Sequence, residues 1–600
     1  MVGPQYDLLA NPLGVVRSTF DTAISSGSDP TSLNGRDWGA IDLFRHFLSD
    51  QSQLSQVPLL TPATIKYVKP NTLVRFRGMI QDMLGNEFYV GTFKDGSVWR
   101  TNKFTDFAQY PIPAGSSVDT QIWERRLLYC VPIPGLSPWA EYTPDTVADV
   151  SMDCTSDQRE KRRRGDDESS DMHVENDEVV EVSPNSKRMR EGEHPSLAPQ
   201  PQGAVPETAS SCTSLVPGLN GNSSSCIVKI YDTPESELRL NDIFEFVGIL
   251  TSDLELQDDC EDRDLLNGLS EDPLHHFPPN KVPRLHCLIH RKLSTLDFLQ
   301  KTPIIELKPD LVKGIRESLL KYLSAVLGND DVAAHFMLLH LLSKDQFAFD
   351  QVQARVDAIA VGKFSVNFTC FNKESASIFG KQLNLAVKNL VPFTHCIPLT
   401  VEYLNTASLA PKKNYDKNRL ETGVLQLAEG SHLIVDETKL EAGTLNSVGV
   451  ENASLLKNLM ENQKVDYDFK YYKMEMATDV QLLVLSEGKS NILPADVIVP
   501  IRPSATNCSE AVSAETLEAW RWYLGTVRQL PHCMESGMEK MVESDLVDAI
   551  QADRSLSIQD FSRWLTMGRL MSLSYGETSM SLEHWQMARE LERLRRERLK

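Results

Sequence analysis

The stretch that most constrains this chain is Leu433-Ile434-Val435-Asp436-Glu437, where three large apolar residues run directly into two acids. Such a run is typical of a strand buried in a parallel sheet, with Asp436 and Glu437 at its carboxyl end. In nucleotide-hydrolysing proteins, a strand of this kind (the Walker B strand) carries an Asp that holds Mg²⁺ and a Glu that polarises the attacking water. The alternative is an ordinary strand that runs into an acidic turn.

Strand-like and helix-like segments alternate on both sides of this run, which predicts an α/β domain over residues 308–505. We expect strands at 358–368, 396–404, 425–437 and 479–485, and helices near 373–390 and 452–463. Two further helices precede them, because a periodic apolar pattern stops at Gly328 and resumes after Asn329 or Asp330, either of which can cap a helix. This alternation is typical of a layered domain with a largely parallel sheet.

A different pattern, the period-two alternation of β-strands, occupies residues 61–139 and 225–300. NTLVRFRGMI at 71–80 and NDIFEFVGIL at 241–250 share Asn, Phe and Gly at identical spacing. A turn that enters a strand ending at a Gly bend is typical of small β-barrels such as OB-folds. In addition, Leu84-Gly85-Asn86 predicts a turn between the first strand and the next.

Helical segments lie at both ends of the chain. Within residues 1–60, the apolar positions 41, 44, 47 and 48 share one helical face, so we expect this helix to dock on the neighbouring domain; a partner-binding helix is the alternative. Residues 513–600 are mostly helical, with Ser557 and Ser581 at N-cap positions. The chain ends in a crowd of basic residues, which suits a helix C-terminus, and a phosphate-contacting tail is the alternative.

Residues 140–224 contain too few large apolar groups to offset the entropy of ordering, so we expect a disordered insertion there. It carries two basic clusters, which are Lys161, Arg162, Arg163 and Arg164, and then Lys187, Arg188 and Arg190. A flexible basic cluster is a candidate nuclear-import signal, and a solvated charge run is the alternative. Ser183, which precedes Pro184, is a candidate phosphorylation site. Residues 253–280 predict a second loop, which is acidic.

The overall charge and cysteine usage exclude several classes of protein. A net charge of -22 repels phosphate at long range, so we expect no direct nucleic-acid binding. The 10 Cys show neither a C-x-x-C pair nor zinc spacing, which predicts no metal site and a reducing compartment. The chain has no apolar run long enough to span a membrane and no secretory start, so we expect no membrane association.

Several long phrases then resemble known families. The order of the blocks is similar to that of the MCM (mini-chromosome maintenance) proteins, the replicative helicase subunits. The phrases WERRLLYCVPIPG, LVRFRGMIQDMLGNEFY, VDETKLEAGTLNSVGVENASLLKNL, QKVDYDF and SEGKSNILPAD more closely resemble the MCM-binding proteins, in particular the plant members. The resemblance implies an OB-like barrel at 61–139 and 225–300 split by the insertion, a degenerate AAA+-like α/β domain, and a helical lid-like bundle at 513–600.

The residues that nucleotide chemistry needs are missing. A P-loop requires G-x-x-x-x-G-K-[ST], and the candidate Gly362-Lys363-Phe364 has Phe where a hydroxyl must reach Mg²⁺. We therefore interpret it as a turn into a strand. The MCM arginine finger lies in a phrase that resembles L-S-R-F-D, whereas the matching place here ends at Asp496. Arg569 falls where the lid's sensor arginine sits, and we expect it to pair with an acid of its own domain.

We therefore expect a protein that is not an enzyme, needs no cofactor and binds MCM helicase subunits. The resemblance implies a nuclear protein that acts in DNA replication as an assembly chaperone or an unloader of MCM complexes, with chromatin association through MCM and roles in sister-chromatid cohesion and cell division. An OB-fold binder of single-stranded DNA is the alternative. It would use aromatic and basic residues of the first barrel segment, which are Arg75, Phe76, Arg77, Phe88, Tyr89, Arg125, Arg126 and Tyr129. A residual ATPase is the third hypothesis.

Overall fold

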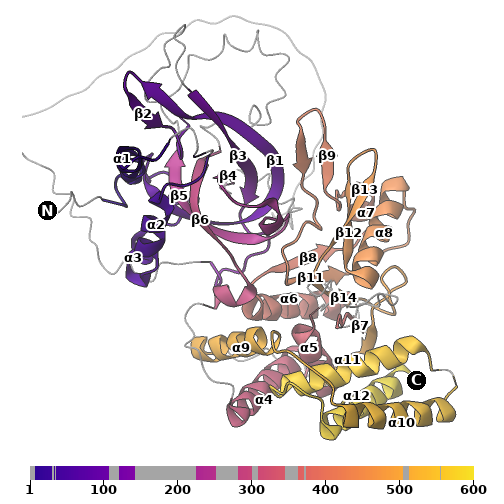
Figure 1. Ribbon diagram of the computed structural model, residues 1–600. Coiled ribbons are helices and arrows are strands. Elements are labelled where there is room, and N and C mark those ends of the chain that lie inside the picture. The colour runs from indigo at the N-terminus through magenta and orange to yellow at the C-terminus, as the bar shows by residue number, and fades with distance from the viewer. Residues whose placement is uncertain are drawn as a thin grey trace, which may run out of the picture. The chain divides into compact units, whose positions relative to one another are not determined.

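The computed structural model describes most of the 600-residue chain (Figure 1). The described residues are 7–29, 33, 35–106, 120–141, 225–251, 282–299, 308–344, 362–369, 373–504, 512–554 and 556–600. They belong to one unit, which comprises residues 1–142 and 215–600. The acidic loop and residues 142–224 of the predicted insertion, with their candidate residues, lie outside the described residues. The first two residues of the insertion, Ala140 and Glu141, are described, and both of their amides donate to Ser137 O.

The two β phrases form a single sheet that closes on itself. Its strands are β1 (Leu73–Asp95), β2 (Val98–Thr101), β3 (Thr120–Val131), β4 (Cys226–Ile230), β5 (Ile243–Thr251) and β6 (Arg284–Lys292). The strand order is β2-β1-β3-β4-β6-β5, and an additional pairing of β1 with β5 closes the ring. Three neighbouring strands from before the long insertion (β2, β1 and β3) and three from after it (β4, β6 and β5) thus belong to one barrel, whose interior holds Phe76 and Phe246.

The predicted turn at Leu84-Gly85-Asn86 is wrong. Strand β1 continues through it, and the register with β3 shifts between Met83 and Gly85. Gly85 adopts a φ of 92°, which a bulge needs and which glycine tolerates at no steric cost. Two further register shifts in the same pair, at Ile80/Asp82 and Val90/Thr92, add to this one. Bulges of this type bend a long strand so that it can follow a barrel wall.

The recurring Asn-Phe-Gly pattern corresponds to a local two-fold relationship between β1 and β5. Phe76 lies directly opposite Phe246 in the antiparallel register. Asn71 and Asn241 both have left-handed backbone conformations, with φ of 62° and 69°. The Asn71 amide donates to Leu250 O at 2.7 Å, and the Asn241 amide donates to Ile80 O at 2.9 Å. Each Asn therefore forms the turn that enters its own strand, and its amide bonds a carbonyl group of the other strand.

Helices α1 (Pro12–Ser25), α2 (Ala40–Leu48) and α3 (Gln51–Gln56) precede the barrel. The amphipathic helix predicted near residue 41 is α2, and its Phe44 is fully buried with Ile249 and Leu288 of the barrel. Docking on the barrel is thus confirmed for this face of the helix. The 3₁₀ turns η1 (Glu235–Glu237) and η3 (Thr295–Phe298) lie beside the second barrel segment.

A five-stranded sheet forms the centre of the α/β part. Its strands are β7 (Val366–Thr369), β8 (Thr394–Pro398), β11 (Ser431–Asp436), β14 (Val480–Leu485) and β15 (Val497–Pro500). They follow the order β15-β7-β14-β11-β8, and all four pairings are parallel. The predicted parallel sheet is confirmed. The strand expected at 396–404 ends early, because the Thr400 side chain accepts from the Tyr403 amide and starts a helix.

A second, four-stranded sheet and three helices complete this part. The strands are β9 (Lys412–Asn414), β10 (Arg419–Glu421), β12 (Lys464–Asp468) and β13 (Lys473–Ala477), in the order β10-β9-β12-β13. The helices are α6 (Lys373–Leu390), α7 (Val401–Thr406) and α8 (Ser447–Asn462). Strands β12 and β13 pair antiparallel as a hairpin whose first strand lies in the phrase QKVDYDF.

The remaining helices pack on the parallel sheet or on one another. They are α4 (Pro309–Val326), α5 (Asp331–Leu342), α9 (Ala514–Val527), α10 (Ser536–Ala552), α11 (Ile558–Ser574) and α12 (Leu582–Leu599). The predicted caps Asp330, Ser557 and Ser581 each accept from a backbone amide in the first turn. None of the helices in the described part is both long and apolar enough to cross a membrane.

The basic end of α12 is bonded within the fold. Arg598 contacts Asp330 at 2.6 Å and Arg595 contacts Glu592 at 2.7 Å, and both arginines also donate to carbonyl groups of β15. These contacts hold the last helix against the sheet. Arg595 and Arg598 are therefore not available to contact phosphate, as the alternative of a phosphate-contacting tail would need.

The barrel contacts the four-stranded sheet at the bulge of β1. The Leu420 amide donates to Asp82 Oδ2 at 2.6 Å, while Gln81 Nε2 donates to Leu420 O at 2.9 Å. Gln426 returns a bond to Gln81 O at 2.9 Å. Burial raises the pKa of Asp82, as expected for a carboxyl group removed from water. The bulge thus directs two polar side chains out of the barrel wall and onto β10.

Candidate functional site

Asp436 and Glu437 lie at the carboxyl end of strand β11 in the parallel sheet. Leu433, Ile434 and Val435 are fully buried, as the apolar run predicts. Asp436 Oδ1 accepts from the Thr438 amide at 3.0 Å and from the Thr438 hydroxyl at 2.6 Å. The Asp436 carboxylate therefore closes a local turn at the end of its own strand.

The Glu437 carboxyl group is buried and bonded to another part of the chain. Its Oε1 accepts from Ser490 Oγ at 2.6 Å, and that hydroxyl accepts from the Leu493 amide at 2.9 Å. Burial raises the pKa of Glu437 above its usual range, although the Ser490 bond opposes the shift. Glu437 thus connects β11 to the loop that leads into β15.

The P-loop candidate lies at the other edge of the sheet. Gly362 and Lys363 precede β7, whereas Asp436 ends the parallel strand β11. Lys363 Nζ donates to Met460 O at 2.9 Å and contacts Asp496 Oδ1 at 3.1 Å. With about 3.3 Å of rise per strand residue, the amino and carboxyl ends of these parallel strands lie about 15–20 Å apart. Lys363 therefore occupies the turn into a strand that we predicted.

Asp496, at the place matched to the arginine finger, holds the start of β7. Its Oδ2 accepts from the Ser365 amide at 2.9 Å and from Ser365 Oγ at 2.7 Å. The Ser365 hydroxyl also accepts from the Asp496 amide at 2.9 Å. These reciprocal bonds join the entries of β7 and β15, two neighbouring strands. Asp496 has a structural position that a guanidinium could not fill.

The topology also shows where a P-loop would have to lie. A P-loop connects a strand to the following helix, and the corresponding unit here runs from β7 to α6. Only residues 370–372, with the sequence Cys-Phe-Asn, separate these two elements. That sequence contains no glycine and is too short for the eight-residue motif. The sequence alone does not indicate this position, because only the order of the strands shows which strand-to-helix connection would hold a P-loop.

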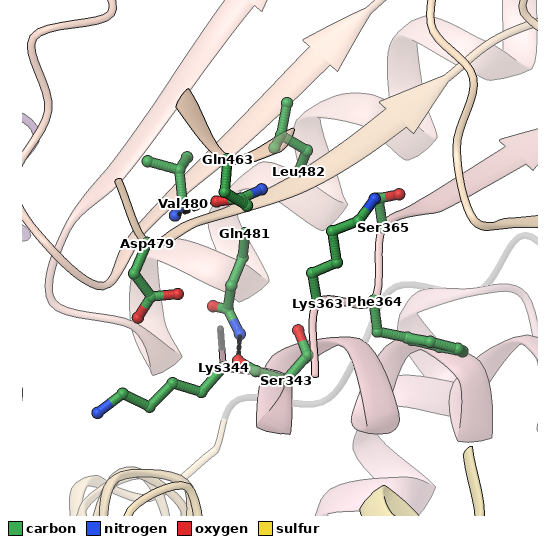
Figure 2. A pocket seen from close by; sticks show the side chains of 10 residues that line it. All are labelled: Ser343, Lys344, Lys363, Phe364, Ser365, Gln463, Asp479, Val480, Gln481 and Leu482. Atoms are coloured by element: carbon green, nitrogen blue, oxygen red, sulfur yellow. Dashed lines mark hydrogen bonds between the residues drawn. The ribbon is translucent and has the colours of Figure 1, made fainter. Parts of the chain in front are cut away.

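Figure 2 shows a narrow pocket at the amino edge of the parallel sheet, lined by residues from the entries of β7 and β14. Gln481 Nε2 donates to the carbonyl oxygens of His340, Leu341 and Ser343, at 2.9, 3.0 and 2.9 Å. The Arg528 guanidinium donates to the same Ser343 oxygen at 2.9 Å. These donors satisfy the last carbonyl groups of helix α5. The polar groups of this pocket are thus used for capping.

A pair of buried histidines lies next to this pocket. His340 Nε2 and His432 Nε2 are 3.0 Å apart, and His340 Nδ1 lies 2.7 Å from Phe364 O. Since the Phe364 carbonyl can only accept, His340 carries its proton on Nδ1, and His432 donates from Nε2. Burial lowers the pKa of His340 to about 4 and that of His432 well below its usual range. Both rings are neutral at pH 7, so they offer no charge to a phosphate.

Arg569 differs from our expectation. Burial alone lowers the pKa of this guanidinium, and its Nε and Nη1 have no hydrogen-bond partner among the described residues. The predicted pairing with an acid of its own domain is therefore wrong within that part of the chain. A buried arginine without a carboxylate costs desolvation energy that nothing nearby returns.

The residues proposed for single-stranded DNA binding are mostly committed to the barrel. Phe76 is buried in its core, as the strand alternation predicted. Arg77 contacts Glu245 at 2.8 Å, and Arg125 contacts Glu87 at 2.7 Å. Of the four aromatic candidates, Phe88 alone is largely exposed. The barrel therefore does not bring free arginines and stacking rings together on one face.

No group of three His, Cys, Asp or Glu side chains in the described ranges is arranged to hold a metal ion. The import candidates Lys161, Arg162, Arg163, Arg164, Lys187, Arg188 and Arg190, and the phosphorylation candidate Ser183, lie outside those ranges.

The closed barrel, the parallel sheet with an acidic strand end and the surrounding helices define a mixed α/β protein, in which Lys363, Asp436, Glu437 and Asp496 are all bonded within the fold. The family model described as mini-chromosome maintenance replisome factor matches residues 44–599, and the chain belongs to this family. The mini-chromosome maintenance complex-binding protein of Arabidopsis thaliana is 56% identical over 606 residues, covering 100% of both chains. The proteins of the same name from Salmo salar and Homo sapiens are 34% and 31% identical, with 99% of this chain and 97% and 98% of the relatives covered. The resemblance drawn from the sequence phrases is confirmed.

Proposed function

We propose that this chain is a non-enzymatic factor that binds subunits of the MCM complex during DNA replication. Its family and its relatives are named for binding that complex. The protein would act as an assembly chaperone for free MCM subunits, as an unloader of the helicase from chromatin, or as both. Its association with chromatin would be indirect, through MCM.

One observation carries the non-enzymatic part of the proposal, namely the position of Lys363 relative to Asp436. A nucleotide site needs its phosphate-binding lysine and its metal-binding acid within reach of the same triphosphate. Here Lys363 lies at the amino ends of the parallel strands and Asp436 at their carboxyl ends. Each is bonded to a nearby residue, Lys363 to Asp496 and Asp436 to Thr438. This separation supports a chain that has lost nucleotide hydrolysis.

The parallel sheet with an acidic strand end supports an AAA+-like origin for residues 308–505, with residues 513–600 as the counterpart of the lid. The five-stranded ring of the barrel supports the OB-fold interpretation. A chain with the shape of an MCM subunit could occupy a subunit-like interface without completing an ATP site. An arginine finger is worth about 10³–10⁵ in rate, so its replacement by Asp496 would leave a neighbour's nucleotide unhydrolysed.

Nucleotide titration tests this part of the proposal. We expect purified protein to show no saturable heat with Mg²⁺-ATP by isothermal titration calorimetry, and no phosphate release above that of a buffer control. Phosphate release that disappears in a Glu437→Gln variant would establish the residual ATPase and overturn the proposal.

We further propose that the protein is nuclear and that its basic clusters direct import. The family resemblance also suggests roles in sister-chromatid cohesion and cell division. A fluorescent fusion in which both clusters are neutralised should lose nuclear enrichment, while neutralisation of the exposed Lys457 and Lys464 serves as a matched control. Unchanged nuclear enrichment of the cluster variant would contradict this assignment.

A further inference from the structure

The hairpin of β12 and β13 ends in a cluster of exposed aromatic rings. Tyr471 and Tyr472 are 78% and 58% exposed, and Tyr415, from the neighbouring turn between β9 and β10, is 46% exposed. Exposed aromatic side chains gathered in one place are uncommon on a protein surface and mark interaction sites. We call Tyr415, Phe469, Tyr471 and Tyr472 the aromatic tip.

The aromatic tip is held in place before any partner arrives. Tyr415 Oη donates to Phe469 O at 2.9 Å, which links the two hairpin turns. The rings of Tyr415 and Tyr471 meet edge to face with centroids 5.7 Å apart, and those of Phe469 and Tyr472 stack at 5.0 Å. Because the rings already restrain one another, a partner that buries them loses little conformational entropy.

Strand β13, which continues from the tip, is an open edge of its sheet. It is the last strand in the order β10-β9-β12-β13, and no other strand of the described part pairs with its outer side. The Phe469 amide donates to Tyr472 O, and the Thr478 amide donates to Gln463 O, so these are hydrogen-bonded pairs. By the alternation of an antiparallel ladder, the backbone groups of Lys473, Glu475 and Ala477 point outward.

The charges around this surface favour a protein over a nucleic acid. Three lysines here pair with acids, Lys464 with Glu475, Lys473 with Glu451, and Lys417 with Glu421, while the Lys470 ammonium lies over the Tyr471 ring at 5.7 Å. Nucleic-acid binding requires cations that are free to replace the counterions of phosphate. A rim of mostly paired charges around exposed tyrosines is instead typical of a protein interface.

We propose that the aromatic tip and the outer edge of β13 form the docking surface for an extended segment of an MCM subunit, an inference that rests on the proposed function. The segment adds a strand to β13 through the outward amide and carbonyl groups of Lys473, Glu475 and Ala477. Its apolar side chains then cover the rings of Tyr471 and Tyr472. Strand addition supplies affinity, and the aromatic tip supplies specificity.

The first test removes the aromatic rings. The full-length chain is titrated into the purified MCM complex, and the affinity is compared with that of Tyr471→Ala/Tyr472→Ala and of Tyr67→Ala. Tyr67 is 86% exposed and lies elsewhere on the chain, so it matches the exposure of the tip. We expect the tip variant to bind about 30-fold more weakly. The Tyr67 variant should bind as the unaltered chain does.

The second test separates the backbone from the side chain at the edge. Glu475→Pro removes the outward amide, and Glu475→Ala removes the same side chain and the same contact with Lys464 but keeps the amide. Proline is tolerated at the outer positions of an edge strand. We expect Glu475→Pro to bind about tenfold more weakly than Glu475→Ala. Melting curves of all variants establish that they are folded.

The outcomes distinguish this inference from the proposed function. If the unaltered chain binds the MCM complex and the tip and edge variants bind equally well, the docking surface is wrong and the proposed function stands. If the unaltered chain does not bind, both fail. If the variants instead lose affinity for a labelled single-stranded oligonucleotide, or lose self-association in gel filtration, the occupant is a nucleic acid or a second copy and the inference is overturned.

Discussion

Lys363 and Asp496 form an ion pair, with Nζ and Oδ1 3.1 Å apart, at the entry of two neighbouring parallel strands. Lys363 belongs to the Gly-Lys pair considered above as a P-loop candidate, and Asp496 lies at the place that the sequence resemblance matches to the MCM arginine finger. Their contact lies at the amino ends of the strands, away from Asp436 at the carboxyl end of β11. Lys363 and Asp496 both stabilise the start of β7.

The contacts of Asp496 predict that this residue matters more to the fold than Lys363 does. Asp496→Ala removes two bonds to Ser365 and leaves the Lys363 ammonium half-buried, so we expect local stability to fall by about 2–3 kcal/mol. Lys363→Ala removes one partly exposed ion pair and one bond to Met460 O, and should cost about 1 kcal/mol. Hydrogen exchange of the β7 and β15 amides measures both. Equal costs for the two variants would contradict this ranking.

Glu437 predicts a pH-dependent difference between the protein and its neutral variant. Burial raises the pKa of Glu437, so its contribution to stability is complete below the unfolded pKa of 4.5 and is lost as pH rises through the folded pKa. Glu437→Gln keeps an acceptor for Ser490 and has no charge to bury. Its melting temperature relative to the unaltered protein should therefore be higher at pH 8 than at pH 5.

Ser490→Ala is the matched variant for this site. It leaves the Glu437 carboxyl group buried without its donor, so we expect a loss of about 1.5–3 kcal/mol at pH 8. The same substitution in the Glu437→Gln background should cost less, because a neutral amide is cheaper to leave unpaired. A double-mutant cycle with no coupling would refute a role for this hydrogen bond.

The histidine pair predicts sensitivity to mild acid. The pKa of His340 is about 4 in the folded protein, against 6.5 for an unperturbed ring, so only the unfolded chain takes up this proton between those values. The contribution of each histidine should be constant above pH 6.5 and should fall towards pH 4 by about 1.4 kcal/mol for each pH unit. His340→Gln/His432→Leu should flatten this part of the pH profile, and an unchanged slope would show that other groups cause it.

The same substitution, Asn to Gly, should have a small effect on stability at Asn71 and a larger one at Asn241. Both have positive φ, where glycine is unstrained, so Asn71→Gly should change stability by less than about 0.5 kcal/mol. The Asn241 side chain also contacts the buried Tyr467 hydroxyl, with Nδ2 and Oη 2.8 Å apart. Asn241→Gly should therefore cost about 1–2 kcal/mol in thermal unfolding. Equal effects at the two positions would mean that the Tyr467 contact adds nothing.

Features with a local signal could be predicted from the sequence. The buried run before Asp436 gave a parallel strand, and the caps at Asp330, Ser557 and Ser581 began helices as expected. Two local predictions were wrong for local reasons. Gly85 forms a bulge rather than a turn, and Thr400 caps a helix where a strand was expected.

The arrangement of the candidate site could not be predicted, because it depends on the order of strands in the sheet. Nothing near Lys363 indicates that it lies at the edge opposite Asp436. The partners His340 and His432 are 92 residues apart, and the Asp82 carboxylate and Leu420 are 338 residues apart. Such contacts follow from tertiary packing, which periodicity does not encode.

The most direct test of the central claim is a binding titration of the purified full-length chain against the purified MCM complex, by analytical ultracentrifugation with and without Mg²⁺-ATP. We predict saturable binding with the same affinity in the presence and absence of nucleotide. A non-hydrolysable analogue replaces ATP in this comparison, so that hydrolysis by the MCM complex does not contribute. Absence of binding would contradict the account, as would binding that requires nucleotide held by this chain and is lost in Glu437→Gln.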